Sequence, residues 1–159
     1  MSDKDIYGHI SQNLEVRENE KNEFGEVFTS SVLIDELFDN LPASSWTNPK
    51  LTWLDPCSGK GNFLALAYIR LMKGLSKKIR DKVKRSQHIL TNMLYMIEIN
   101  SSSVQELHKL FGKDANISNA DFLDNKKKWE NDLGQTQFDI IVGNPPFQVS
   151  KSNKYEGSV

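Results

Sequence analysis

The chain has 159 residues, 20 Lys and Arg against 21 Asp and Glu, a formal net charge of −1 and one Cys. This length allows one domain with a hydrophobic core but not two full domains. A single Cys excludes an internal disulfide framework and a multi-cysteine zinc site. A near-neutral charge is not typical of a domain that grips nucleic acid by itself. We expect a reducing, cytoplasmic setting, and the sequence holds no apolar run of about 18 residues that would predict a membrane span.

Three regions follow one another along the chain. Residues 1–22 are polar, residues 23–148 hold the apolar periodic segments, and residues 149–159 form a polar tail that we expect to be disordered.

The apolar segments alternate between strand and helix patterns. A helix is expected after Ser30 or Ser31, either of which could cap it, and Pro42 should stop it. Apolar runs predict strands at 51–55, 94–99, 115–119 and 138–142. Helices are expected at 62–75 and 101–111, with a loop containing a helical piece at 126–135. This order predicts an α/β fold with a mostly parallel sheet covered on both faces.

The first candidate site runs from Asp55 to Gly61, where a strand passes through a glycine turn into a helix. Glycine allows the backbone to approach a ligand, and a helix N-terminus offers unused N–H groups. The turn lacks the three-glycine dinucleotide spacing, and Lys60 inside the glycine pair does not fit a phosphate loop. A plain strand-to-helix turn is the alternative interpretation.

Two acidic positions follow the next strands. Glu98, at the end of its strand, could accept two hydrogen bonds from a ribose diol. Asp121 could accept from an adenine amine while Phe122 stacks on a purine. The alternatives are a solvent-exposed Glu, and a solvated Asp beside a core Phe.

The sharpest pattern is Asn144-Pro145-Pro146-Phe147, directly after an apolar strand. Two prolines remove two backbone donors, so this backbone presents only carbonyl acceptors. Asn144 adds a side-chain carbonyl and Phe147 a stacking face. An amine on a planar aromatic base fits this set of groups.

Taken together, these segments resemble the S-adenosylmethionine-dependent N6-adenine DNA methyltransferases. Residues 55–63 resemble the cofactor motif of that family, residues 144–147 its catalytic motif, and residues 24–29 the segment that closes over the methionine end of the cofactor. The resemblance implies cofactor contacts from Phe28, Thr29, Asp55, Pro56, Cys57, Gly59, Gly61, Phe63, Glu98, Ile99, Asp121 and Phe122. It implies catalytic roles for Asn144, Pro145, Pro146 and Phe147.

The resemblance also implies a Rossmann-like class I methyltransferase fold and a mechanism. The enzyme would extrude an adenine from double-stranded DNA, as in restriction-modification systems, and methylate its exocyclic amine. The motif order suggests the subgroup whose recognition domain follows the catalytic domain.

Some features depart from the family pattern. Ser30 stands where the family often has Pro, and the basic segment 77–85 lengthens the spacing between Asp55 and Glu98. Because the sequence stops soon after the catalytic motif, we expect an incomplete fold of about four strands. Such a chain should bind cofactor without turnover and should self-associate through the open edge of residues 138–142.

Several alternatives remain. A nucleophilic role for Cys57, as in cytosine-C5 methyltransferases, is rejected because this residue lies in the cofactor turn. Ribosomal-RNA-base and protein-glutamine methyltransferases also carry the Asn-Pro-Pro pattern, and an inactive cofactor-binding domain is a further possibility. The basic segment is expected opposite the active face. The scattered His9, His88 and His108 suggest no metal site.

Overall fold

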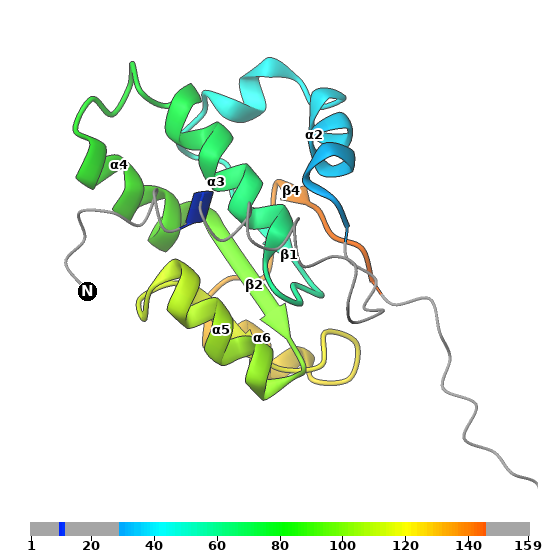
Figure 1. Ribbon diagram of the computed structural model, residues 1–159. Coiled ribbons are helices and arrows are strands. Elements are labelled where there is room, and N and C mark those ends of the chain that lie inside the picture. The colour runs from blue at the N-terminus through cyan, green and yellow to red at the C-terminus, as the bar shows by residue number, and fades with distance from the viewer. Residues whose placement is uncertain (1–9, 12–28, 146–159) are drawn as a thin grey trace, which may run out of the picture.

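The computed structural model describes residues 10–11 and 29–145. Four strands form its sheet, β1 (Trp53–Asp55), β2 (Leu94–Glu98), β3 (Asn116–Asn119) and β4 (Ile140–Ile141). Their order is β3-β2-β1-β4, and every pair is parallel. Helices flank this sheet, so the predicted α/β, Rossmann-like architecture is confirmed (Figure 1).

The helical elements connect the strands in sequence. They are α2 (Ser31–Asp39), a 3₁₀ turn η2 (Ala43–Trp46), α3 (Asn62–Gly74), α4 (Lys82–His88), a π-helical turn η3 (Ile89–Met93), α5 (Ser101–Phe111) and α6 (Lys126–Leu133). In the part of the chain that the structure describes, no helix is both long and apolar enough to cross a bilayer.

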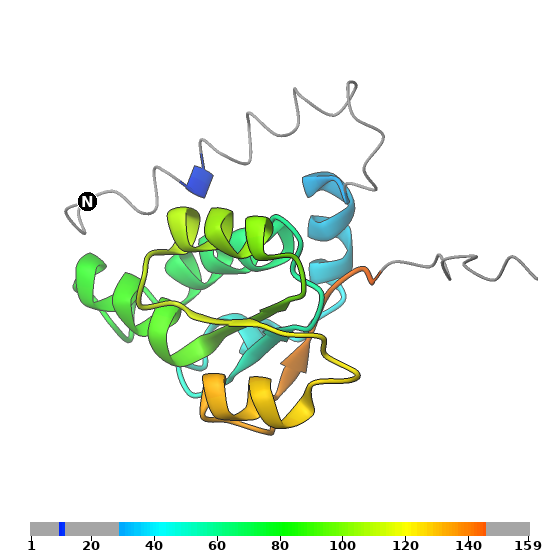
Figure 2. The ribbon, with the colours of Figure 1, turned by 90° about the horizontal axis from the view of Figure 1, so that it is seen from below.

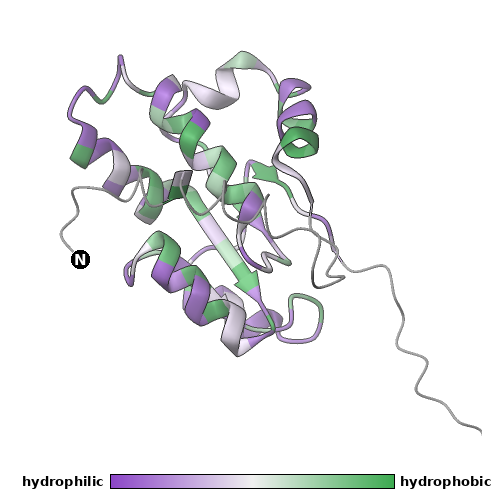
Figure 3. Ribbon diagram, viewed as in Figure 1, coloured by the Kyte–Doolittle hydropathy of each residue, from purple (hydrophilic) through white to green (hydrophobic). Residues whose placement is uncertain are grey.

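Two hydrophobic clusters cover the two faces of the sheet. Trp53 and Met96 face the larger cluster, which includes residues of α2, α3 and α5. Leu54 and Ile97 point the other way and pack with α6. Figure 2 shows α3 and α5 on one side of the sheet and α6 on the other. In Figure 3, apolar residues run through α3 and β2, whereas hydrophilic residues interrupt α5.

Helix α2 begins as expected and is held to α3 by an arginine side chain. The Ser30 hydroxyl accepts a hydrogen bond from the Leu33 N–H at 3.3 Å, which confirms the predicted cap. Arg70 on α3 donates to Asp35 at 2.7 Å, and its guanidinium lies 5.2 Å from the Trp46 ring centroid. The contact with Asp35 holds the middle of α2 against α3, and the contact with Trp46 adds the turn η2.

Two elements differ from the sequence expectation. Helix α4 forms within and beyond the basic segment because the Asp81 carboxylate accepts from Val83 and Lys84 N–H groups, at 2.9 and 3.0 Å. This helix follows the far end of α3 from the glycine turn, so the basic segment lies opposite that turn, as expected (Figure 1).

Strand β4 is shorter than the predicted 138–142, but its hydrogen bonds extend further. Asp139 and Ile140 N–H groups donate to the Thr52 carbonyl, and Val142 N–H donates to that of Leu54 at 2.9 Å. The segment from Asp139 to Val142 is therefore hydrogen-bonded alongside β1, and this pairing ends before Gly143.

Candidate active site

The order of the strands places a crevice at the carboxyl ends of β1 and β4. The chain passes from β1 to β2 and β3 in one direction, and β4 then lies on the opposite side of β1. Ligands of open α/β sheets bind at such a reversal of strand order. Asp55 is the last residue of β1, and Asn144 follows β4 by three positions. The two sequence motifs therefore meet at this crevice.

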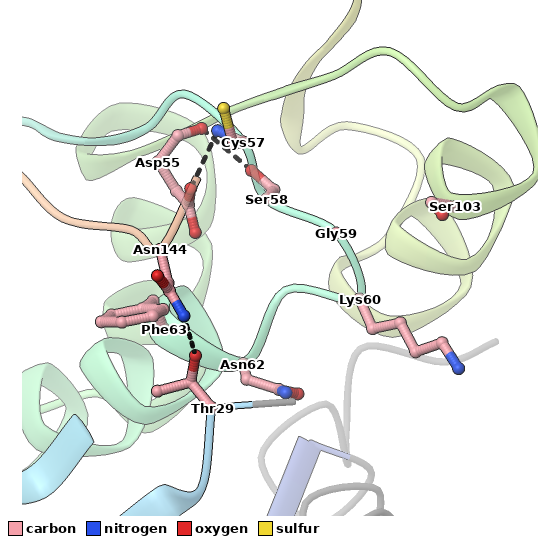
Figure 4. A pocket seen from close by; sticks show the side chains of 10 residues that line it. All are labelled: Thr29, Asp55, Cys57, Ser58, Gly59, Lys60, Asn62, Phe63, Ser103 and Asn144. Carbon is pink, nitrogen blue, oxygen red and sulfur yellow. Dashed lines mark hydrogen bonds between the residues drawn. The ribbon is translucent and has the colours of Figure 1, made fainter. Parts of the chain in front are cut away.

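A pocket of about 240 Å³ occupies the crevice. It is lined by Thr29, Asp55, Cys57, Ser58, Gly59, Lys60, Asn62, Phe63, Ser103 and Asn144. Figure 4 shows Asp55, Asn144 and Thr29 on one wall with Phe63 beside them, and Lys60 and Ser103 across from them.

Hydrogen bonds that involve Asp55 and Ser58 shape the glycine turn. The Asp55 carboxylate accepts from the Cys57 N–H at 3.1 Å, and the Ser58 hydroxyl donates to the Asp55 carbonyl at 2.9 Å. The Ser58 N–H donates to the Ile97 carbonyl at 3.0 Å, which ties the turn to β2. Pro56 begins this turn and is half-buried.

The two glycines of the turn have different surroundings. Both have positive φ, +52° at Gly59 and +84° at Gly61. A Cβ on Gly61 would lie 2.6 Å from Leu107 and 2.8 Å from Phe111 of α5. A Cβ on Gly59 would meet nothing within 4 Å. Gly61 thus allows α3 and α5 to pack, whereas Gly59 leaves open space in the pocket wall.

Glu98 holds the glycine turn in place. One carboxylate oxygen accepts from the Gly59 N–H and the other from the Asn100 N–H, both at 2.7 Å. Each carboxylate oxygen has a second lone pair, so the group can still accept a hydrogen bond from a hydroxyl. Glu98 itself does not line the pocket, although its partner Gly59 does.

Three predicted cofactor contacts lie outside the pocket, namely Ile99 and the two residues assigned to the adenine, Asp121 and Phe122. The Asp121 carboxylate accepts from the N–H groups of Leu123 and Asp124, at 2.8 and 3.2 Å. Phe122 stacks on Trp129 with ring centroids 5.5 Å apart. Ile99 follows β2 and is 66% exposed. Of the predicted site residues, the pocket brings together Thr29, Asp55, Cys57, Gly59, Phe63 and Asn144, but not Pro56, Gly61, Glu98 or these three. The roles of all of them stay predictions.

One wall of the pocket carries the buried Asp55 carboxyl group, and Lys60 lies across from it (Figure 4). Burial raises the pKa of Asp55 to about 7, with the Cys57 N–H opposing this shift and the Glu98 charge adding to it. The pKa of the Cys57 thiol is also raised, by burial first and then by the charges of Asp55, Glu98 and Asp121. Such surroundings favour a cationic ligand and keep the thiol protonated.

The segment after β4 is pinned against this wall. A Cβ on Gly143 would lie 2.8 Å from the Asp55 carboxylate, so the backbone passes directly over that group. The Asn144 side-chain NH₂ donates to the Thr29 hydroxyl at 3.1 Å. Pro145 is exposed. Phe28, Pro146 and Phe147 lie outside the described residues, so their predicted roles stay predictions.

Some pocket residues had no role in the sequence interpretation. Ser58, Lys60 and Asn62 belong to the glycine turn and to the start of α3, so their proximity follows from their place in the motif. Ser103 comes from the first turn of α5. Its place near the pocket could have been predicted, because this helix begins shortly after Glu98 at the end of β2.

Comparisons with known proteins identify the family of this chain. The model of the N-6 DNA Methylase family matches residues 2–158. An adenine-specific methylase of Mycoplasma pneumoniae (strain ATCC 29342 / M129), itself described as uncharacterized, is 27% identical over 85% of this chain and 48% of its own length. The chain thus spans about half the length of this curated relative. The present chain therefore belongs to the N-6 DNA methylase family.

Proposed function

We propose that this chain holds the cofactor and catalytic centre of an S-adenosylmethionine-dependent methyltransferase acting on the N6 amine of adenine in DNA. The observation that carries this proposal is the meeting of Asp55 and Asn144 in one pocket at the reversal of strand order. Family membership supports adenine methylation, and the acceptor groups of the pocket suit a cationic cofactor and an amine substrate.

The pocket fits the methionine end of the cofactor. Its volume of about 240 Å³ is below the roughly 300–1,000 Å³ of sites for drug-sized ligands. The open space at Gly59 and the first turn of α3 suit the amino-acid part of the cofactor. Asp55 offers negative charge for the ammonium and sulfonium groups. The adenosine part would extend toward Glu98, Ile99 and Asp121.

Asn144 and Pro145 would receive the target amine. The Asn144 side-chain carbonyl and the Pro145 main-chain carbonyl are acceptors, and they would bind the two N–H groups of the base. Accepting a hydrogen bond from each N–H favours loss of planarity at the amine, so its lone pair leaves conjugation with the ring and can take up the methyl group. The nitrogen releases one N–H proton to water in the same reaction. The cofactor supplies an activated methyl group when it is bound. The chain thus aligns the amine, and no covalent enzyme adduct is required.

Proposals about the wider activity rest on the family alone. The target adenine would be extruded from double-stranded DNA, with Phe147 stacking on it. A restriction-modification role and a cytoplasmic location accord with this chemistry and with the single Cys. Methylation of an RNA base or a protein glutamine is the competing proposal.

The experiment measures cofactor binding by calorimetry and methyl transfer from labelled cofactor to DNA, RNA and a glutamine-containing protein. We expect saturable binding, with any label located on adenine N6 of DNA. Asn144→Ala should keep cofactor affinity and lose any transfer that the wild-type chain shows, whereas Asn131→Ala on the surface of α6 should change neither. Binding without transfer supports the expectation that the chain by itself is inactive. Absence of cofactor binding refutes the proposal.

We also propose self-association through β4. Ile141 is 62% exposed, and in the described residues β4 pairs only with β1. An unpaired strand edge with an apolar side chain can pair with another chain. Sedimentation at tens of micromolar should show dimers or larger species, which Ile141→Lys should reduce. A monodisperse wild-type monomer would contradict this.

A further inference from the structure

Thr29 and Asn144 connect two distant parts of the chain at the pocket wall. They are 115 positions apart, and the Asn144 NH₂ group donates to the Thr29 hydroxyl at 3.1 Å (Figure 4). Both residues line the pocket. The sequence interpretation gave Thr29 to the cofactor, but the contact that the structure shows is with the residue proposed to bind the target amine.

An asparagine side chain has one accepting and one donating end. Rotation about its terminal torsion is broad, so an amide without a fixed partner samples many orientations. Activation of the target amine requires the Asn144 carbonyl oxygen to face it. If the NH₂ end faced the amine, two donors would lie opposite each other and no hydrogen bond would form. A partner that accepts from the NH₂ end therefore leaves the oxygen available to the pocket.

We propose that Thr29 is a positioning residue, which holds the Asn144 side chain with its carbonyl oxygen available to the target amine. This rests on the proposed function. The hydrogen bonds would form a chain, from the amine to the Asn144 oxygen and from the Asn144 nitrogen to Thr29. Bonds in such a chain polarise one another, so the bond to Thr29 also makes the Asn144 oxygen a stronger acceptor.

The surroundings of both residues make this contact a fixed one. Thr29 directly precedes the cap of α2, and Arg70 fixes that helix through Asp35. On the other side, Gly143 packs against the Asp55 carboxylate and sets the path of the backbone into Asn144. The hydroxyl and the amide are therefore presented to each other by two anchored segments.

The test compares Thr29→Val, which keeps the shape and removes the hydroxyl, with Thr29→Ser, which keeps the hydroxyl. Thr47→Val is the control, since Thr47 is exposed and lies outside the pocket. In the ¹⁵N-labelled full chain, the Asn144 NH₂ signal is identified by its loss in Asn144→Asp. We expect its heteronuclear NOE to fall in Thr29→Val to the value of exposed Asn131, and to be retained in Thr29→Ser and Thr47→Val.

Cofactor affinity separates positioning from cofactor binding. We expect the dissociation constant of S-adenosylmethionine to change less than about twofold in Thr29→Val, with an unchanged melting temperature. Where transfer is measurable, its single-turnover rate should fall about tenfold, which corresponds to about 1.4 kcal/mol, and recover in Thr29→Ser.

Two results would overturn the inference. One is an unchanged Asn144 signal in Thr29→Val, and the other is a loss of cofactor affinity that accounts for the whole effect. Failure of the proposed function would look different. The wild-type chain would then bind no cofactor, although the Asn144 signal still depended on the Thr29 hydroxyl.

Discussion

The glycine pair of the turn gives a matched test of the site, because one glycine packs and the other faces open space. Alanine at Gly61 places a Cβ 2.6 Å from Leu107 and 2.8 Å from Phe111, whereas alanine at Gly59 meets no atom within 4 Å. Both residues have positive φ, so the backbone cost is similar for the two variants. Only the packing cost differs.

The magnitude follows from these two costs. A left-handed conformation costs alanine about 1–2 kcal/mol, partly offset by about 0.4–1 kcal/mol because alanine restricts the unfolded chain. Overpacking adds about 1–3 kcal/mol at Gly61, since Leu107 and Phe111 are fully buried and cannot move aside freely. Gly61→Ala should therefore be less stable than Gly59→Ala by about 1–3 kcal/mol.

Urea unfolding followed by circular dichroism measures this difference, and calorimetry measures cofactor binding at low denaturant. We expect Gly59→Ala to remain folded and to lose at least about tenfold in cofactor affinity, because Gly59 lines the pocket. Equal unfolding free energies for the two variants, or full cofactor affinity in Gly59→Ala, would refute the reasoning.

Four further predictions concern Asp55, Cys57 and Asp139. Because the pKa of Asp55 is raised to about 7, the carboxyl group is increasingly protonated below pH 7, so affinity for the cationic cofactor should fall from pH 8 to pH 6, and Asp55→Asn should abolish this dependence. The same raised pKa favours folding at low pH and this contribution is lost as the pH rises through about 7, so the stability of Asp55→Asn relative to the wild type should increase from pH 5 to pH 8 in thermal unfolding. The raised pKa of Cys57 predicts slow alkylation by iodoacetamide at pH 7, faster reaction at pH 9 and protection by cofactor, and cofactor-independent labelling would contradict its place in the pocket. The Asp139 carboxylate accepts hydrogen bonds from the N–H and hydroxyl of Thr52, at 2.8 and 3.0 Å. Asp139→Ala should therefore lower the unfolding free energy by about 1–2 kcal/mol. An unchanged urea midpoint would show that these two bonds do not stabilise the fold.

Local patterns predicted the elements that depend on neighbouring residues. The apolar runs around Leu54 and Ile97 predicted buried parallel strands, because only a sheet covered on both faces needs them. Ser30 predicted a helix start through its hydroxyl. Helix α4 was missed, since Val83 is the one aliphatic residue among its seven and no apolar period shows, although Asp81 was a usable cap signal.

Contacts between distant segments could not be predicted in this way. No periodicity connects Thr29 with Asn144, because their contact depends on how α2 docks on α3 and on where β4 ends. The Asn100 N–H reaches Glu98 locally, but the bond from the Gly59 N–H depends on the approach of the glycine turn to β2. Sequence patterns thus placed Glu98 at a strand end, while its bond to the turn required the fold.

The two ends of the site differ in how far their hydrogen bonds are already committed. At the end proposed for the methionine group, Asp55 shapes the glycine turn, and Glu98, proposed to meet the ribose, holds that turn from the side of β2. Both carboxylates still have lone pairs for a ligand. At the adenine end, the Asp121 carboxylate serves its own turn and Phe122 packs on Trp129. A preformed turn lowers the ordering cost of binding. The first end therefore needs little rearrangement, and any adjustment to an adenosine group falls on the loops after β2 and β3.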